Sequence, residues 1–263
     1  MDLGLKDRVA IVAASSQGLG KGVALALARE GAKLAICARR PDAIQAAAEE
    51  IRALTGVEVL ARAMDVTAAD QVRALVEETR RRFGRIDVCV TNAGGPPSKT
   101  FAETSVDDWI SAVNLNLMST VHFAREVLPV MQQQRWGRFI TITSVAVKQP
   151  IDGLILSNSV RSAVSGLVKS LANEYGRYNV LVNSVCPGYT RTERLTELST
   201  RLAARGATTT AEIERQWTNQ IPLGRLAEVE EFASVVAFLA SDRASYLTGA
   251  SIAIDGGYIK GIT

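Results

Sequence analysis

A run of small residues with two glycines follows the first apolar stretch of the chain. Residues 13–20 read Ala-Ala-Ser-Ser-Gln-Gly-Leu-Gly and lead into a segment with helical spacing. Glycines let a backbone approach a pyrophosphate closely, and a helix N-terminus offers unpaired N–H groups to it. Small residues also form ordinary tight turns, so the position between a strand and a helix carries the interpretation. It predicts a dinucleotide-phosphate site formed by Ala14, Ser16, Gln17, Gly18, Leu19 and Gly20.

Two arginines follow the second apolar stretch, where a sheet of this kind contacts the adenine ribose of a dinucleotide. An acidic residue there usually binds the ribose 2′-hydroxyl of NAD. This chain instead has Ala38 followed by Arg39 and Arg40. No carboxylate would repel a 2′-phosphate, and a guanidinium can pair with it through two N–H groups. The pattern favours NADP(H), with NAD(H) the weaker cofactor, although arginines in a loop are also often simply solvated.

Short β-branched runs alternate with longer amphipathic stretches along the chain. Near-continuous apolar strands separated by helices are typical of a parallel sheet covered on both faces. We therefore predict one α/β domain over residues 1–263, a Rossmann-like doubly wound parallel sheet of about seven strands. The strands are expected at 8–14, 33–38, 57–63, 86–91, 138–143, 180–185 and 251–254, and the two longest helices at 106–134 and 153–175.

Composition and charge exclude several classes of protein. The 263 residues are 47% hydrophobic with a net charge of +3, unlike a disordered or collagen-like chain. The densest basic run, at residues 80–85, stands at a predicted helix end, where cations complement the helix dipole. No apolar run approaches about 18 residues, and the start lacks the features of a secretory signal. We therefore expect no nucleic-acid partner and no membrane segment.

The cysteines and the single histidine indicate no metal or disulfide chemistry. Three cysteines cannot form a disulfide framework, and each lies in or at the end of an apolar run: Cys37, Cys89 and Cys186. This usage predicts buried, reduced thiols in a cytoplasmic protein. His122 lies in a predicted helix of otherwise apolar face and is expected to be structural, so no metal site is predicted.

Taken together, these motifs resemble the short-chain dehydrogenase/reductase family over essentially the whole chain. Residues 13–20 match the family's T-G-x-x-x-G-x-G motif, with alanines in place of the Thr and the first Gly. Residues 92–94 match its N-A-G segment, and residues 187–192 match P-G-x-x-x-T, which holds the nicotinamide carboxamide and phosphates. The resemblance implies further cofactor contacts at Asp65, Val66, Asn92, Ala93, Gly94, Pro187, Gly188, Tyr189, Thr190 and Thr192.

The resemblance also assigns the catalytic positions, and here the chain departs from the family pattern. Ser144 matches the catalytic serine, and Asn116, seven residues after Trp109, matches the asparagine that helps to hold an active-site water. Family members have a Tyr thirteen residues after the Ser and a Lys four residues later, but this chain has Ser157 and Arg161 there. No Tyr precedes a Lys by four residues anywhere, and the flanking helix matches without a gap. We interpret the Tyr and Lys as replaced.

The replacement changes the proton chemistry that the site can do. A Tyr phenol beside Lys⁺ exchanges a proton with a carbonyl oxygen near neutral pH, whereas a Ser hydroxyl is a far weaker acid. Arg161 can supply charge and hydrogen-bond a ribose, but it cannot lose a proton. We expect Ser144, Ser157, Arg161 and Asn116 to form the catalytic group, with a slowed or differently assisted proton transfer. Tyr189 is a weaker substitute for the missing phenol.

Two functions from different classes remain open. The first is an NADP(H)-dependent carbonyl reductase or alcohol dehydrogenase acting on a small-molecule carbonyl or alcohol. The second is a nucleotide-binding pseudoenzyme or regulatory subunit without turnover. Ser144, Asn116 and the cofactor motifs favour the first, because hydride positioning can survive the loss of general acid–base catalysis.

One polar segment, at residues 193–220, departs from the alternation of strands and helices. Loops of this length are usually functional lids or disordered. Its position directly after the Pro-Gly motif predicts a lid over the active site that orders when cofactor or substrate binds. Within it, Arg194 and Arg201 are candidates for contact with an acid or a thioester carrier. The resemblance further implies a homotetramer, in which the helices at 106–134 and 153–175 pair across two-fold axes.

Overall fold

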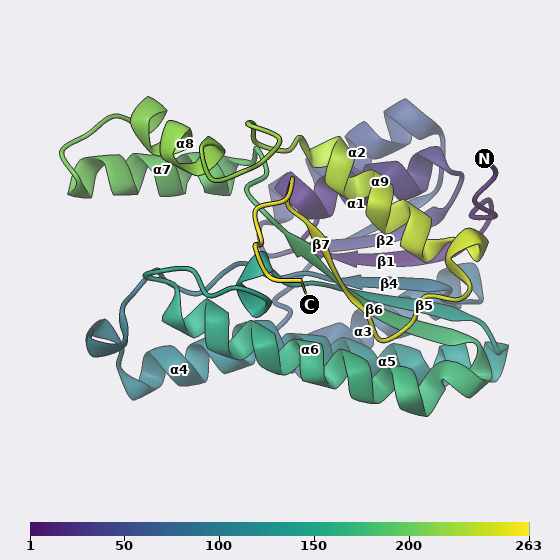
Figure 1. Cartoon of the computed structure of the whole chain (residues 1–263). Coiled ribbons are helices and arrows are strands. Elements are labelled where there is room, and N and C mark those ends of the chain that lie inside the picture. The colour runs from purple at the N-terminus through teal and green to yellow at the C-terminus, as the bar shows by residue number, and fades with distance from the viewer. Residues whose placement is uncertain (263) are drawn as a thin grey trace.

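Seven parallel strands form the central sheet (Figure 1). The computed structural model describes residues 1–262 and orders the strands β3-β2-β1-β4-β5-β6-β7. The direction of strand order reverses between β1 and β4, which is the switch point where α/β sheets bind ligands. The predicted strands are all present, with ends that differ by at most two residues: β1 Val9–Ala13, β2 Lys33–Ala38, β3 Val59–Ala63, β4 Val88–Thr91, β5 Gly137–Ile142, β6 Val180–Pro187 and β7 Ser251–Ile254.

Helices cover both faces of the sheet, which confirms the doubly wound prediction (Figure 1). One layer contains α1 (Gly18–Arg29), α2 (Pro41–Thr55) and α9 (Val229–Ala240). The opposite layer contains α3 (Ala69–Phe83), α4 (Val106–Ala112), α5 (Ser119–Gln134) and α6 (Ile155–Tyr175). Strand β1 shows why both layers are needed, because Val12 belongs to the core under α1 and α9, whereas Ile11 belongs to the core under α3 and α5.

Two sequence expectations about single elements are confirmed. The arginine run lies in the last turn of α3, where it faces the negative end of the helix dipole. The three cysteines are buried and unpaired, and burial raises the pKa of the Cys37 thiol to about 12. In the described residues, no helix is long and apolar enough to cross a bilayer.

The stretch predicted as one long helix at 106–134 is interrupted. Between α4 and α5 the chain forms a π-helical turn over Val113–Met118. Such wider turns insert an extra residue and are frequent at functional sites. This one carries Asn116, whose side chain is 5% exposed.

The polar segment at 193–220 is not the long loop that the sequence suggested. It folds into α7 (Glu193–Arg205) and α8 (Thr210–Thr218), which extend away from the sheet at the left of Figure 1. Thr192 caps α7 by accepting a hydrogen bond from the Leu195 amide, and Thr209 caps α8 in the same way. Both helices are polar on one side and contribute buried residues to a small separate core that includes Val145, next to Ser144.

Candidate active site

The glycine turn between β1 and α1 leaves its backbone open to a ligand. Gly18 has φ +57°, and a side chain at Gly20 would come within 2.9 Å of the carbonyl carbon of Ala14. The Asn92 amide donates to the Ala14 carbonyl at 3.4 Å, which joins the turn to the end of β4. Helix α1 has no side-chain cap at Gln17 and no acid in its first turn. Its first N–H groups are therefore free of side-chain acceptors, as an incoming pyrophosphate requires.

The two arginines after β2 lie exposed beside this turn. Arg40 donates to the Gln17 amide oxygen at 2.9 Å, so the end of β2 is tied to the glycine turn. Asp65 accepts hydrogen bonds from the amide and hydroxyl of Thr67 at 2.9 and 2.8 Å. The hydrogen bond from the Thr67 amide is the largest cause that holds the pKa of Asp65 below its ordinary value; burial opposes it, and the Thr67 hydroxyl and the charge of Arg39 add smaller lowering effects.

The segment after β6 meets the glycine turn from the other side. A side chain at Gly18 would make van der Waals contact with the Thr192 methyl group at 3.6 Å. At Gly188 a side chain would collide with the Asp255 backbone, at 2.8 Å from its Cα, so only glycine fits this close approach. Thr190 is buried. The predicted cofactor residues from the glycine turn, the N-A-G segment and the Pro-Gly segment therefore lie around one end of the sheet.

Ser144 and Ser157 come from different elements. Ser144 follows β5 and begins a short turn, in which its Oγ accepts a hydrogen bond from the Ala146 amide at 3.1 Å. The hydroxyl proton of Ser144 is left for another acceptor. Ser157 lies in the first turn of α6, where its side chain is buried.

Arg161 lies one turn further along α6 and is 8% exposed. Its Nη1 donates to the carbonyl oxygens of Ile142 and Thr143 at 3.2 and 3.0 Å, and its Nη2 donates to the Gly94 carbonyl at 3.4 Å. Arg161 thus ties the end of β5 to the N-A-G segment. Burial, with a smaller effect of the Arg194 charge, lowers its pKa to about 10, so the guanidinium stays charged at neutral pH.

Asn116 reaches the same carbonyl from the π-helical turn. Its Nδ2 donates to the Gly94 oxygen at 2.9 Å. Its Oδ1 is buried and makes no hydrogen bond within the described residues. A buried acceptor of this kind commonly binds a water or a ligand donor. Gly94 therefore joins Asn116 and Arg161, two of the four predicted catalytic residues.

The ring of Tyr189 packs against two other aromatic side chains. Its ring stacks on Trp217 with centroids 5.0 Å apart, and it meets Tyr258 edge-on at 5.3 Å. Burial, together with Tyr258, raises the pKa of Tyr189 well above its ordinary value. A raised pKa makes the Tyr189 phenol a weaker acid. The stacked ring of Tyr189 also holds Trp217 of α8 against the segment that follows β6.

The sequence analysis missed two contributors to this site. Beneath Ser144, the Thr143 hydroxyl bonds to the Ser184 hydroxyl at 2.7 Å and contacts the Cys186 sulfur at 3.3 Å. No pattern in the sequence marks this cross-strand cluster. Gly95, directly after the N-A-G segment, lies against the guanidinium of Arg194. A second consecutive glycine was a signal for such a close approach.

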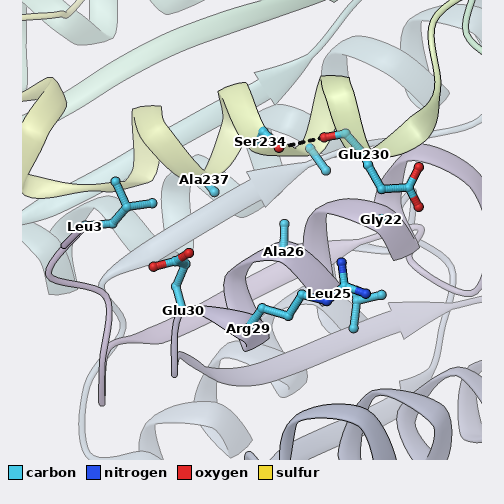
Figure 2. A pocket seen from close by; sticks show the side chains of 10 residues that line it. Leu3, Gly22, Leu25, Ala26, Arg29, Glu30, Glu230, Ser234 and Ala237 are labelled. Carbon is cyan, nitrogen blue, oxygen red and sulfur yellow. Dashed lines mark hydrogen bonds between the residues drawn. The ribbon is translucent and has the colours of Figure 1, made fainter. Parts of the chain in front are cut away.

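A pocket between α1 and α9 lies apart from these residues (Figure 2). The small Gly22 and Ala26 allow the two helices to approach, and a side chain at Gly22 would collide with Val229. Ser234 donates to the carbonyl of Glu230 within α9, at 2.8 Å. The pocket contains none of the predicted site residues, and its lining follows from helix packing.

Comparison with known proteins agrees with this architecture. A family model described as enoyl-(acyl carrier protein) reductase matches residues 13–259. The chain is 34% identical to the 3-oxoacyl-(acyl-carrier-protein) reductase FabG of Aquifex aeolicus, over 98% of this chain and 99% of that protein. A dinucleotide-binding oxidoreductase is thus the class that the fold and the site define. The chain belongs to the short-chain dehydrogenase/reductase family.

Solved structures in the family are similar over the full length. The L-sorbose reductase of Gluconobacter frateurii, complexed with NADPH and L-sorbose, has a TM-score of 0.95 at 32% identity, with 100% of both chains covered. YwfH, an NADPH-dependent reductase involved in bacilysin biosynthesis, has a TM-score of 0.93 at 28% identity, with 97% of this chain and 99% of that chain covered. Both similarities span the cofactor end and the candidate catalytic residues.

Proposed function

We propose that this protein is an NADP(H)-dependent oxidoreductase that interconverts a small carbonyl compound and its alcohol, without a Tyr-Lys pair. One observation carries the proposal. Asn116 and Arg161 converge on the Gly94 carbonyl beside Ser144, at the end of the sheet where the glycine turn leaves open N–H groups. A cofactor-phosphate cradle and a charged, hydrogen-bonding catalytic group therefore lie at the same end of the sheet.

The residues at this end of the sheet suit an NADP molecule. The amides that follow Gln17 would bind its pyrophosphate, Thr192 would contact its nicotinamide side, and Arg39 would pair with its 2′-phosphate. When bound, NADPH supplies a hydride. The L-sorbose reductase complexed with NADPH and the NADPH-dependent reductase YwfH support this choice of cofactor.

The chain's own residues then account for the fate of the carbonyl group. The carbonyl carbon accepts the hydride and its oxygen accepts a proton, which gives the alcohol. Ser144 donates a hydrogen bond to that oxygen, and Arg161 supplies a fixed positive charge close by. Because neither Ser144 nor Arg161 is an acid near neutral pH, the proton comes from water, for which the Oδ1 of Asn116 offers an acceptor.

NADPH consumption with a panel of ketones, aldehydes and 3-oxoacyl thioesters tests this function. Turnover with any member supports it. A nucleotide-binding protein without turnover is the second candidate, and one observation favours it: Arg161 donates to three backbone carbonyls, as a structural residue would. Tight NADPH binding with no consumption on any compound would favour this second candidate.

The cofactor preference is a separate prediction. We expect NADPH to bind at least about tenfold more tightly than NADH, about 1.4 kcal/mol, in fluorescence titrations. Arg39→Ala should remove most of that difference by weakening NADPH alone. Arg215→Ala is the matched control, since Arg215 lies on α8, pairs with Glu212 at 3.3 Å and is 66% exposed. Equal affinities in the wild type, or unchanged NADPH affinity in Arg39→Ala, would show that the charge argument is wrong.

We also propose that α7 and α8 close over the candidate active site when cofactor binds. Their core reaches Val145 beside Ser144, and Tyr189 stacks on Trp217 of α8. Limited proteolysis with mass mapping should show slower cleavage within residues 193–220 when NADPH is present. Cleavage at the same rate with and without NADPH would contradict a closing lid.

The assembly and the compartment are two further proposals. We propose a cytoplasmic homotetramer that pairs through the helices α4, α5 and α6. Val106 and Ile110 on α4 are 74% and 54% exposed, which supports a covered face there, and the unpaired thiols fit a reducing compartment. Light scattering at micromolar concentration should give about four times the 28.2 kDa chain mass. A monomer peak would contradict this assembly.

A further inference from the structure

Two arginines from different helices meet at the short segment that follows β4. Arg161 of α6 donates to the Gly94 carbonyl at 3.4 Å. Arg194 of α7 lies against the next residue, since a side chain at Gly95 would come within 2.9 Å of its Cζ. Two guanidinium groups therefore approach the same pair of glycines, and the charge of Arg194 lowers the pKa of Arg161 in addition to the larger effect of burial.

No carboxylate balances this pair of charges. Arg161 donates to backbone carbonyls, and neither Arg161 nor Arg194 is in any ion pair among the described residues. Glu197, one turn along α7, acts on Arg194 only as a charge, and Arg201 opposes it. Arg161 is buried, whereas Arg194 is exposed at the surface. Burying a charge beside a like charge is costly, and a ligand that supplies the opposite charge would offset this cost.

Arg161 also lies close to the segment that contains Ser144. Arg161 also donates to the carbonyls of Ile142 and Thr143, the two residues directly before Ser144. The charged parts of the cofactor have other partners, namely the open N–H groups of α1 and the arginines after β2. The uncompensated positive charge is therefore next to the hydroxyl that would contact the reacting carbonyl.

We propose that Arg194 and Arg161 form an anion site for the substrate, so that the enzyme acts on an oxo acid and its hydroxy acid. The inference rests on the proposed reductase function and names its substrate class. Arg194, reaching from the lid, pairs with a carboxylate through two N–H groups, as guanidinium and carboxylate geometry favours. Arg161, held by backbone carbonyls, supplies fixed charge to the carboxylate and to the oxygen that becomes negative as hydride is accepted.

Matched acid and ester probes test the anion site by binding, independently of turnover. The probes are 2-oxopropanoate, 3-oxobutanoate and 4-oxopentanoate, each beside its methyl ester, with affinities measured by saturation-transfer NMR on the NADP⁺-loaded protein at low salt. At least one acid should bind tenfold or more tightly than its ester. Arg194→Ala should reduce this ratio to about one, Arg194→Lys should restore part of it, and the control Arg215→Ala should leave it unchanged.

Several other outcomes would overturn the anion site. It is wrong if no acid binds, if esters bind as well as acids in the wild type, or if Arg215→Ala lowers the ratio as much as Arg194→Ala. If Arg194→Ala weakens NADPH and NADH equally and leaves the acid-to-ester ratio intact, the guanidinium serves the cofactor instead. Acid binding without NADPH consumption would leave the anion site standing and refute the reductase function, so the two failures are distinct.

Discussion

Ser144→Ala is expected to lower kcat for carbonyl reduction by about 10²–10³-fold, the typical loss when one donor to a developing oxyanion is removed. Ser144 lies at the end of β5, and its Oγ accepts from the Ala146 amide, so its proton is free to point at a substrate oxygen. The cofactor residues lie on other segments. The fluorescence-measured Kd for NADPH should therefore stay constant while the rate of NADPH consumption falls.

Two further serines on α6 sharpen this experiment. Ser157→Ala removes the buried hydroxyl at the position where the family resemblance expects a Tyr, and Ser159→Ala removes an exposed hydroxyl as the matched control. If Ser157 assists proton transfer, its loss lowers the rate with NADPH affinity unchanged. If Ser157→Ala is as active as Ser159→Ala while Ser144→Ala is impaired, proton transfer depends on Ser144 or water and not on Ser157. An active Ser144→Ala would refute the proposed role of Ser144.

The sheet and the cofactor end were predictable because their causes are local. Strand β1 is a run of buried apolar residues, and a glycine turn and a helix follow it directly in the sequence. The cofactor preference was also predictable from the arginines after β2, because it depends only on the residue types at the end of that strand. Sequence order alone places these features at the same edge of a parallel sheet.

The helices α7 and α8 were missed, and the orientation of Arg161 was not predictable in the same way. Residues 193–220 are rich in polar side chains, which suggested a loop, although Leu195, Leu198 and Leu202 have helical spacing and Thr192 and Thr209 are ordinary N-cap residues. Arg161 was expected to supply charge toward the cofactor. Its contacts with the backbone at the ends of β4 and β5 depend on how α6 crosses the sheet, which is a property of packing and not of local sequence.

The double change Ser157→Tyr with Arg161→Lys should raise the rate on a permissive oxo substrate by up to about 10²-fold, because it places a phenol beside a cation. Two costs reduce the gain. The larger ring enters a buried position, and overpacking costs about 1–3 kcal/mol. A lysine cannot reproduce all three backbone contacts of Arg161, and hydrogen bonds to charged groups contribute about 1.5–3 kcal/mol each. We therefore expect a lower Tm beside the higher kcat.

The pH profile identifies the source of any gain. In the reduction direction the new phenol must be protonated to donate, so kcat should fall as pH rises through its pKa, which a neighbouring ammonium lowers from about 10. The wild type has no such phenol and should lack this fall. Ser157→Phe with Arg161→Lys is the matched control, since it adds the ring without the hydroxyl. Equal rates for the Tyr and Phe doubles, with NADPH affinity intact, would mean that position 157 does not face the reacting carbonyl.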